Sequence, residues 1–303
     1  MIQDTMLGFF IRLLQKVLNI AISAKKKLSG GEYNIAAHNS KVIQSTQKYD
    51  MVVSPDEPYY QEQYWHWIKK YLDIAKLPAS GTYLDLGCGQ GRLSIPLARW
   101  CADEGKVIGV DFSKKAIEKA QEYAIKAGLS NVGYHAEDIL SFLKSKSSNL
   151  FDAILFLEVI FFMPQYHLVL QEIKRVLKPQ GLLFVSFRSQ YFYALHSVVK
   201  RNFGDIDTIL KNRMGRLSGG DVCFTWQTSG EIRHLIEKEL ELEMLDLCGI
   251  GCCSGIEGDP HAFITQPSLL DQNERDALMK LEITLANSVP DAGRYMLCIA
   301  RKK

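Results

Sequence analysis

The stretch TYLDLGCGQG, residues 82–91, places an apolar run of strand length directly before a loop with three glycines at alternate positions. Glycine lets a backbone turn sharply, and it lets a ligand approach the bare amides at the start of a following helix. The register of the glycines excludes two common nucleotide-binding loops. A dinucleotide loop needs a third small residue where this chain has Arg92, and the GxxxxGK[ST] pattern of a Walker P-loop is absent.

Outward from this stretch, short apolar runs alternate with helical segments. We expect strands at 82–87, 106–111, 132–136, 151–157 and 182–188, and, after an interruption, at 241–248 and 294–301. Helices are expected near 59–76, 92–101, 114–127, 166–177 and 229–239. Unbroken apolar strands separated by helices indicate a parallel sheet that is covered on both faces.

The composition is that of a globular protein. Charged residues are 23% of the 303 and hydrophobic residues 47%, which excludes disordered and collagen-like chains. The net charge of +2 is far from the strong positive field that nucleic acids require, so we expect no nucleic-acid partner. The 7 cysteines show no CxxC spacing, which favours a reducing cytoplasm. The cluster Cys248, Cys252 and Cys253, with His261 nearby, matches no tetrahedral site, and no metal is expected.

Together with Asp85, two positions before the first glycine, the loop matches the D/ExGxGxG pattern of class I S-adenosylmethionine-dependent methyltransferases. The chain resembles this family, and in particular its small-molecule, ubiquinone/menaquinone-methyltransferase-like members, from about Thr82 to Arg188 and again in the last strand. The matching segments are YLDLGCGQG, VIGVDFS, AEDIL, FDAILFLEV and IKRVLKPQGLLFVSF, in family order. The resemblance implies an α/β fold with a doubly wound, seven-stranded, mostly parallel sheet of order 3-2-1-4-5-7-6, and S-adenosyl-L-methionine as cofactor.

The matching positions imply a cofactor site at the carboxyl ends of the strands. There Asp111 would accept hydrogen bonds from both ribose hydroxyls, and Phe112 would lie against adenine. Asp138 would accept from the adenine amino group, and the backbone of Ile139 would serve the ring nitrogens. Asp85 would either lie under the methionine moiety or tie down the glycine loop. The implied set is Asp85, Gly87, Cys88, Gly89, Gly91, Asp111, Phe112, Asp138, Ile139, Leu157 and Glu158.

The acceptor is less constrained than the cofactor. The segment Leu157-Glu158-Val159 lacks the histidine that many relatives have there, and the [ND]PP[YF] element of base-methylating enzymes is missing. Aromatic residues in the two insertions favour a small apolar or aromatic acceptor that is methylated on oxygen or nitrogen. The candidate catalytic residues are His261, Glu158, Arg188 and Tyr191. His261 would act as a base, and Arg188 would bind an acceptor carboxylate or shape the pocket.

The insertions and the N-terminus are expected to form a helical lid over the core. We divide the chain into an N-terminal cap at 1–78, a cofactor-binding core at 79–188, a lid insertion at 189–228, further core at 229–249, a second lid insertion at 250–292 and the last core strand at 293–303. Apolar residues within 1–27 fall on one face of an amphipathic helix. This helix packs on the protein itself, joins a homodimer, lies on a membrane surface as a peripheral contact, or belongs to a transit peptide.

Two alternatives to a cytoplasmic enzyme with a small-molecule acceptor stay open. One is a methyltransferase that acts on a lipid-like quinone precursor at the membrane surface. The other is a non-catalytic protein that binds the cofactor in the same fold.

Overall fold

The computed structural model describes residues 49–101, 104–217, 222–256 and 264–303. The amphipathic segment 1–27 and the candidate base His261 lie outside the described residues. None of the helices in the described ranges is long and apolar enough to cross a membrane.

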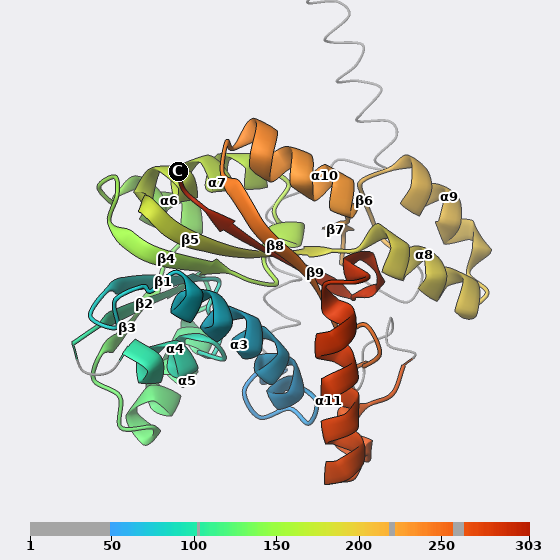
Figure 1. Cartoon of the computed structure of the whole chain (residues 1–303), viewed down its shortest axis with the longest axis horizontal. Helices are drawn as coiled ribbons and strands as arrows, with labels where there is room; N and C mark the ends of the chain where they lie inside the picture. Colours follow the sequence, from blue (N-terminus) through green and yellow to red (C-terminus); the bar gives the residue numbers. More distant parts are fainter. Residues whose placement is uncertain (1–48, 102–103, 218–221, 257–263) are drawn as a thin grey trace, which may run out of the picture. The chain divides into compact units, whose positions relative to one another are not determined.

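A single twisted sheet organises the described part of the chain (Figure 1). Its strands are β1 (Thr82–Leu86), β2 (Lys106–Asp111), β3 (Val132–Ala136), β4 (Phe151–Phe156), β5 (Leu177–Arg188), β8 (Glu243–Ile250) and β9 (Tyr295–Arg301). The order is β3-β2-β1-β4-β5-β9-β8, and β9 is antiparallel to both neighbours. Because β8 and β9 are the sixth and seventh strands of this sheet in chain order, the expected order 3-2-1-4-5-7-6 is confirmed.

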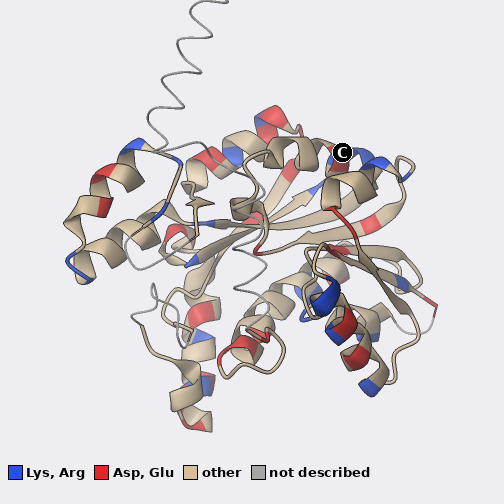
Figure 2. Cartoon of the chain, turned by 180° about the vertical axis from the view of Figure 1, so that it is seen from behind, with Lys and Arg blue, Asp and Glu red and all other residues tan. Residues whose placement is uncertain are grey.

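Helices cover both faces of the sheet (Figure 1). One face carries α3 (Glu57–Ile74), α4 (Ser94–Cys101) and α5 (Lys114–Lys126), and the other carries α6 (Ile139–Lys144), α7 (Tyr166–Val176) and α10 (Ser229–His234), which continues as a π-helical turn at Leu235–Glu239. Helix α5 shows why a helix forms and packs here. The Ser113 side chain caps its first turn, and its small apolar residues Ala116, Ala120 and Ala124 are buried. Figure 2 shows Lys and Arg interspersed with Asp and Glu on the outer helices, in keeping with the net charge of +2.

The core extends from the sheet into α3. All six residues of β4 are buried at the centre of the sheet. On α3, Tyr60 donates its hydroxyl to the Ser254 carbonyl at 2.9 Å, and Gln63 Oε1 accepts from the Gly251 amide at 3.0 Å. These bonds join α3 to the turn that follows β8, where α11 (Gln272–Ala286) also packs. Helix α3 also contributes Tyr59, Tyr64 and Trp67 to the hydrophobic core.

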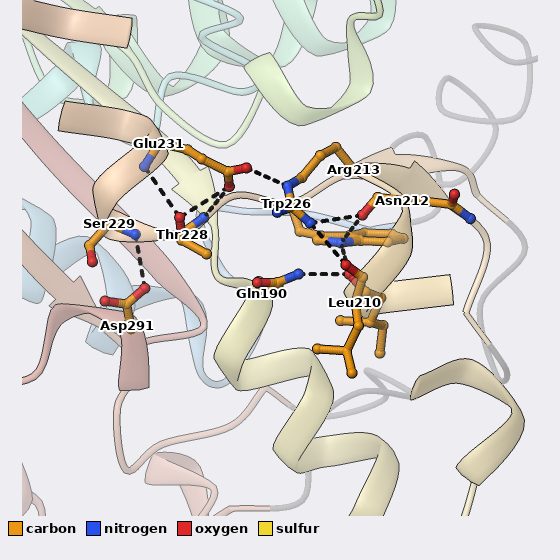
Figure 3. A network of polar contacts seen from close by, with 10 residues as sticks. Gln190, Leu210, Asn212, Arg213, Trp226, Thr228, Ser229, Glu231 and Asp291 are labelled. Carbon is orange, nitrogen blue, oxygen red and sulfur yellow. Dashed lines mark hydrogen bonds and ion pairs between the residues drawn. The ribbon is translucent and has the colours of Figure 1, made fainter. Parts of the chain in front are cut away.

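The first insertion folds into α8 (Gln190–Val199), α9 (Phe203–Lys211) and a short hairpin of β6 (Met214–Gly215) and β7 (Phe224–Thr225). Its centre is Trp226, which is fully buried and donates Nε1 to the carbonyls of Ile209 and Asn212 at 2.9 and 3.1 Å (Figure 3). Arg213 then pairs with Glu231, which closes a capping box with Thr228 at the start of α10 (Figure 3). The insertion is thus anchored to the core at its base.

Candidate active site

The glycine loop after β1 adopts a conformation that other residues rarely reach. Gly87, Gly89 and Gly91 have φ of +71°, +51° and +90°. A Cβ at Gly87 would overlap the Val159 side chain, and one at Gly91 would lie 2.9 Å from the Tyr134 hydroxyl oxygen. The amides of Gly87 and Cys88 both donate to the Val110 carbonyl, at 2.7 and 3.1 Å. The loop is therefore held against the end of β2.

Asp111, at the end of β2, is fixed by this loop. Its Oδ2 accepts from the Gly89 amide at 3.1 Å, and its Oδ1 accepts from the Ser113 amide at 2.8 Å. Burial raises the pKa of this carboxyl above its ordinary value, while the two amide bonds oppose that rise. The adjacent Phe112 ring is 45% exposed although it is apolar. The carboxylate of Asp111, held in place beside the exposed ring of Phe112, fits the ribose and adenine of the expected cofactor.

Asp85, at the end of β1, is buried and incompletely paired. The residue is only 4% exposed, and its Oδ2 has no hydrogen-bond partner among the described residues. Burial raises the pKa of its carboxyl to about 7. An orphaned carboxylate oxygen next to the glycine loop fits the charged amino group of the cofactor's methionine moiety. The surroundings of Asp85 and Asp111 thus fit the groups of S-adenosylmethionine that these residues are expected to bind.

The raised pKa of Asp85 predicts a pH dependence of stability. A carboxyl whose pKa is higher in the folded state than in the unfolded state stabilises the fold below the unfolded pKa, and that contribution is lost as pH rises through the folded pKa. Between pH 5 and pH 8, with the folded pKa near 7, the cofactor-free protein should lose roughly 3 kcal/mol of stability from this group at 1.36 kcal/mol per unit. Urea denaturation of the wild type and Asp85→Asn at both pH values measures it.

The comparison of the two proteins isolates this group, because other titrating residues contribute equally to both. Asp85→Asn should therefore gain stability relative to the wild type as pH rises from 5 to 8. A wild-type and mutant pair whose difference stays constant over this range would contradict a buried, weakly acidic Asp85.

Asp138 caps a helix that the sequence did not predict. Its Oδ1 accepts from the Ser141 amide at 2.9 Å and from the Ser141 hydroxyl at 3.0 Å, which starts α6 at Ile139. The carboxylate is exposed at the end of β3, and Ile139 is buried as the first helical residue. Contact of both residues with adenine stays a prediction.

The loop after β4 is held by a buried ion-pair network that sequence reasoning missed. Arg92 pairs with Glu57 of α3 and, at 2.7 Å, with Glu158, and all three side chains are less than 10% exposed. Glu158 has a φ of +58°, and its amide donates to Ser186 Oγ at 2.7 Å. Leu157, just before it, is buried. The carboxylate of the candidate base Glu158 is thus engaged by a cation, and the network orients the loop.

The other candidate catalytic residues differ in their surroundings. Arg188, at the end of β5, is 9% exposed and has aromatic rings around its guanidinium. Tyr191, on α8, is 56% exposed. His261 lies outside the described residues.

Metal binding has no structural counterpart in the described ranges. These contain no group of three or more His, Cys, Asp or Glu side chains arranged to hold a metal ion. Of the cysteine cluster, Cys248 is buried, and the amides of Cys252 and Cys253 donate to the Glu282 carboxylate at 2.8 and 3.2 Å. The backbone amides of Cys252 and Cys253 thus bind a carboxylate of the protein itself.

Comparison with known proteins assigns the family. Residues 78–239 match the model of a methyltransferase domain, which is more than half of the 303 residues. The chain therefore belongs to the class I S-adenosylmethionine-dependent methyltransferase family, whose glycine loop, acidic residues and sheet order it shares. The resemblance seen in the sequence is confirmed.

Individual relatives are similar over part of their length. The chain is 39% identical over 72 residues (24% of this chain, 16% of the relative) to the 23S rRNA (uracil(1939)-C(5))-methyltransferase RlmD of Acinetobacter baylyi. It is 34% identical over 122 residues (38% and 50%) to a ubiquinone biosynthesis O-methyltransferase of Actinobacillus pleuropneumoniae. The chain thus spans half or less of the length of these curated relatives.

A solved structure extends the similarity of the fold. The magnesium protoporphyrin IX methyltransferase of Synechocystis PCC 6803, solved with bound SAH, superposes with a TM-score of 0.51 at 14% identity, covering 82% of this chain and 85% of that one. At this identity the likeness concerns the fold alone.

Proposed function

We propose that this chain transfers the methyl group of S-adenosylmethionine to the oxygen or nitrogen of a small, apolar or aromatic metabolite. The observation that carries the proposal is the Asp111 carboxylate, held at the end of β2 by the amides of Gly89 and Ser113. Family membership and the similarity to a ubiquinone biosynthesis O-methyltransferase support it.

In this proposal each residue at the carboxyl ends of the strands, here called the cofactor edge, has one task. Asp111 holds the ribose hydroxyls, Phe112 lies against the adenine, the backbone of Ile139 serves the adenine ring nitrogens, and Asp138 accepts from the adenine amino group. Asp85 receives the amino group of the methionine moiety. The bound cofactor supplies a methyl group on a sulfonium, which is transferred by in-line displacement. The protein then contributes mainly by orienting the acceptor and excluding water.

A base is needed only where the acceptor must lose a proton. Glu158, paired with Arg92, suits a positioning role in the proposed enzyme. Tyr191 and His261 remain the candidate bases, and each lies on or near an insertion that follows the cofactor edge.

A second candidate is a lipid-like acceptor at a membrane surface. It is favoured by apolar side chains that α8 and α9 expose, namely Leu195, Val198, Val199, Phe203 and Leu210. Exposed apolar residues on adjacent helices are a common feature of surfaces that contact lipid or protein. We also propose a cytoplasmic location, a homodimer and peripheral attachment to the membrane through 1–27.

Methyl transfer from tritiated S-adenosylmethionine into a fractionated cell extract tests these functions. We expect label in the water-soluble small-molecule fraction, at least tenfold less of it with Asp111→Ala, and none in the tRNA, DNA or protein fractions. Label in the lipid fraction would favour the quinone-type acceptor instead. Cofactor binding without any label would identify a non-catalytic binding protein.

A further inference from the structure

Arg188 is a buried cation without an anion in the described part of the chain. The residue is 9% exposed, and its Nε is sealed from solvent with no hydrogen-bond acceptor. The interactions of its guanidinium with the described residues are contacts with aromatic rings. A charged side chain that is removed from water is normally paired or hydrogen-bonded, because burying it alone is costly.

The rings form an aromatic cage around this guanidinium. Its Cζ lies 3.9 Å from the Phe224 ring centroid, 4.3 Å from Phe161, 5.3 Å from Phe162 and 5.6 Å from Tyr193. Ring faces attract a cation, with contributions of about 0.5–2 kcal/mol in such contacts. They accept none of the five guanidinium N–H groups in the way an oxygen does. The cage therefore holds the charge and leaves the Nε–H without an acceptor among the described residues.

The cage lies between the cofactor edge and the first insertion. Phe161 and Phe162 belong to the 3-10 turn that follows Glu158, while Tyr193 and Phe224 come from α8 and β7. Ser186, two residues before Arg188 on β5, accepts the hydrogen bond from the Glu158 amide. Since residues two apart on a strand share a face, Arg188 is on the same side of the sheet as that contact. The cation is thus placed next to the expected acceptor site.

We propose that Arg188 binds a carboxylate of the acceptor, so that the substrate is an aromatic or apolar carboxylic acid. The inference rests on the proposed methyl transfer and narrows its substrate class. A planar guanidinium and a carboxylate match in a bidentate pair of charge-assisted hydrogen bonds. Phe162, the one ring of the four that is only partly buried, would contact the apolar body of the acid.

Paired probes that differ only in charge test this assignment without turnover. The full chain, saturated with S-adenosylhomocysteine, is titrated with 4-hydroxyphenylacetate and with the neutral 4-hydroxyphenylacetamide, and affinity is measured by calorimetry. We expect the acid to bind at least tenfold more tightly than the amide. Arg188→Met should abolish that preference, and Arg188→Lys should retain part of it, while S-adenosylhomocysteine binds all three proteins equally.

A second measurement, of thermal stability, distinguishes ligand binding by Arg188 from a purely structural role. A guanidinium that awaits a ligand is poorly satisfied in the free protein, so Arg188→Met should melt at the same or a higher temperature than the wild type. Two results would overturn the carboxylate site. One is equal affinity of the wild type for the acid and the amide, including no binding of either. The other is a preference for the acid that survives Arg188→Met. Intact acid preference without any methyl transfer would instead overturn the proposed function alone.

Discussion

Replacing Arg92 by methionine is expected to lower the free energy of unfolding by about 3–5 kcal/mol, which is the usual penalty for removing one partner of a buried ion pair. The substitution leaves the carboxylates of Glu57 and Glu158 buried, close together and without their cation. Methionine keeps much of the side-chain volume and removes the guanidinium, so the loss reports mainly on charge rather than on a cavity. Chemical denaturation at pH 7 measures it.

Two further variants make the test specific. Arg99→Met removes an exposed arginine from α4, the helix that begins two residues after Arg92, and should change stability by less than about 1 kcal/mol. The double variant Glu57→Gln with Arg92→Met removes one of the stranded charges and should recover part of the loss. An Arg92→Met protein as stable as the wild type would show that the network can be replaced by apolar packing, and the loop after β4 would then need another anchor.

The core of the fold could be predicted because its signals are local. The central strands β1 and β4 are almost entirely buried, and the glycines at 87, 89 and 91 mark a loop that only positive φ can form. The chain order of the strands, combined with the family pattern, was sufficient for the sheet order. Short α6 escaped prediction because six residues carry too little periodicity, and its start depends on the Asp138 cap.

The polar network of the site could not be predicted, because its partners are distant in sequence. Arg92 was noticed only as a residue that breaks a dinucleotide pattern, yet its partners Glu57 and Glu158 lie 35 and 66 residues away. The same limit applies to Arg188, whose cage joins the loop after β4 to the insertion. Sequence named Arg188 as a candidate, but only packing shows that aromatic rings and no described carboxylate surround it. Charge balance within a buried site is a property of the assembled fold.

Asp111→Ala is expected to weaken S-adenosylmethionine binding by at least about 100-fold, or roughly 3 kcal/mol, because a hydrogen bond to a charged group contributes about 1.5–3 kcal/mol and the carboxylate is expected to accept two. The loss has a second source in the protein itself. Without the carboxylate, the amides of Gly89 and Ser113 lose their acceptor, and the glycine loop loses its tie to the end of β2. Calorimetric titration of S-adenosylmethionine into both proteins measures the effect.

Asp111→Asn separates these two sources. The amide oxygen can still accept from one of the two backbone amides, but the charge is lost and the Nδ2 group faces a donor, so affinity should fall nearly as far while the fold is retained. Asp207→Asn is the matched control, since its carboxylate is exposed on α9, where it pairs with Lys211. That variant should lose less than tenfold. Wild-type affinity in Asp111→Ala would mean that the end of β2 does not hold the ribose, and with it the observation that carries the proposed function would be lost.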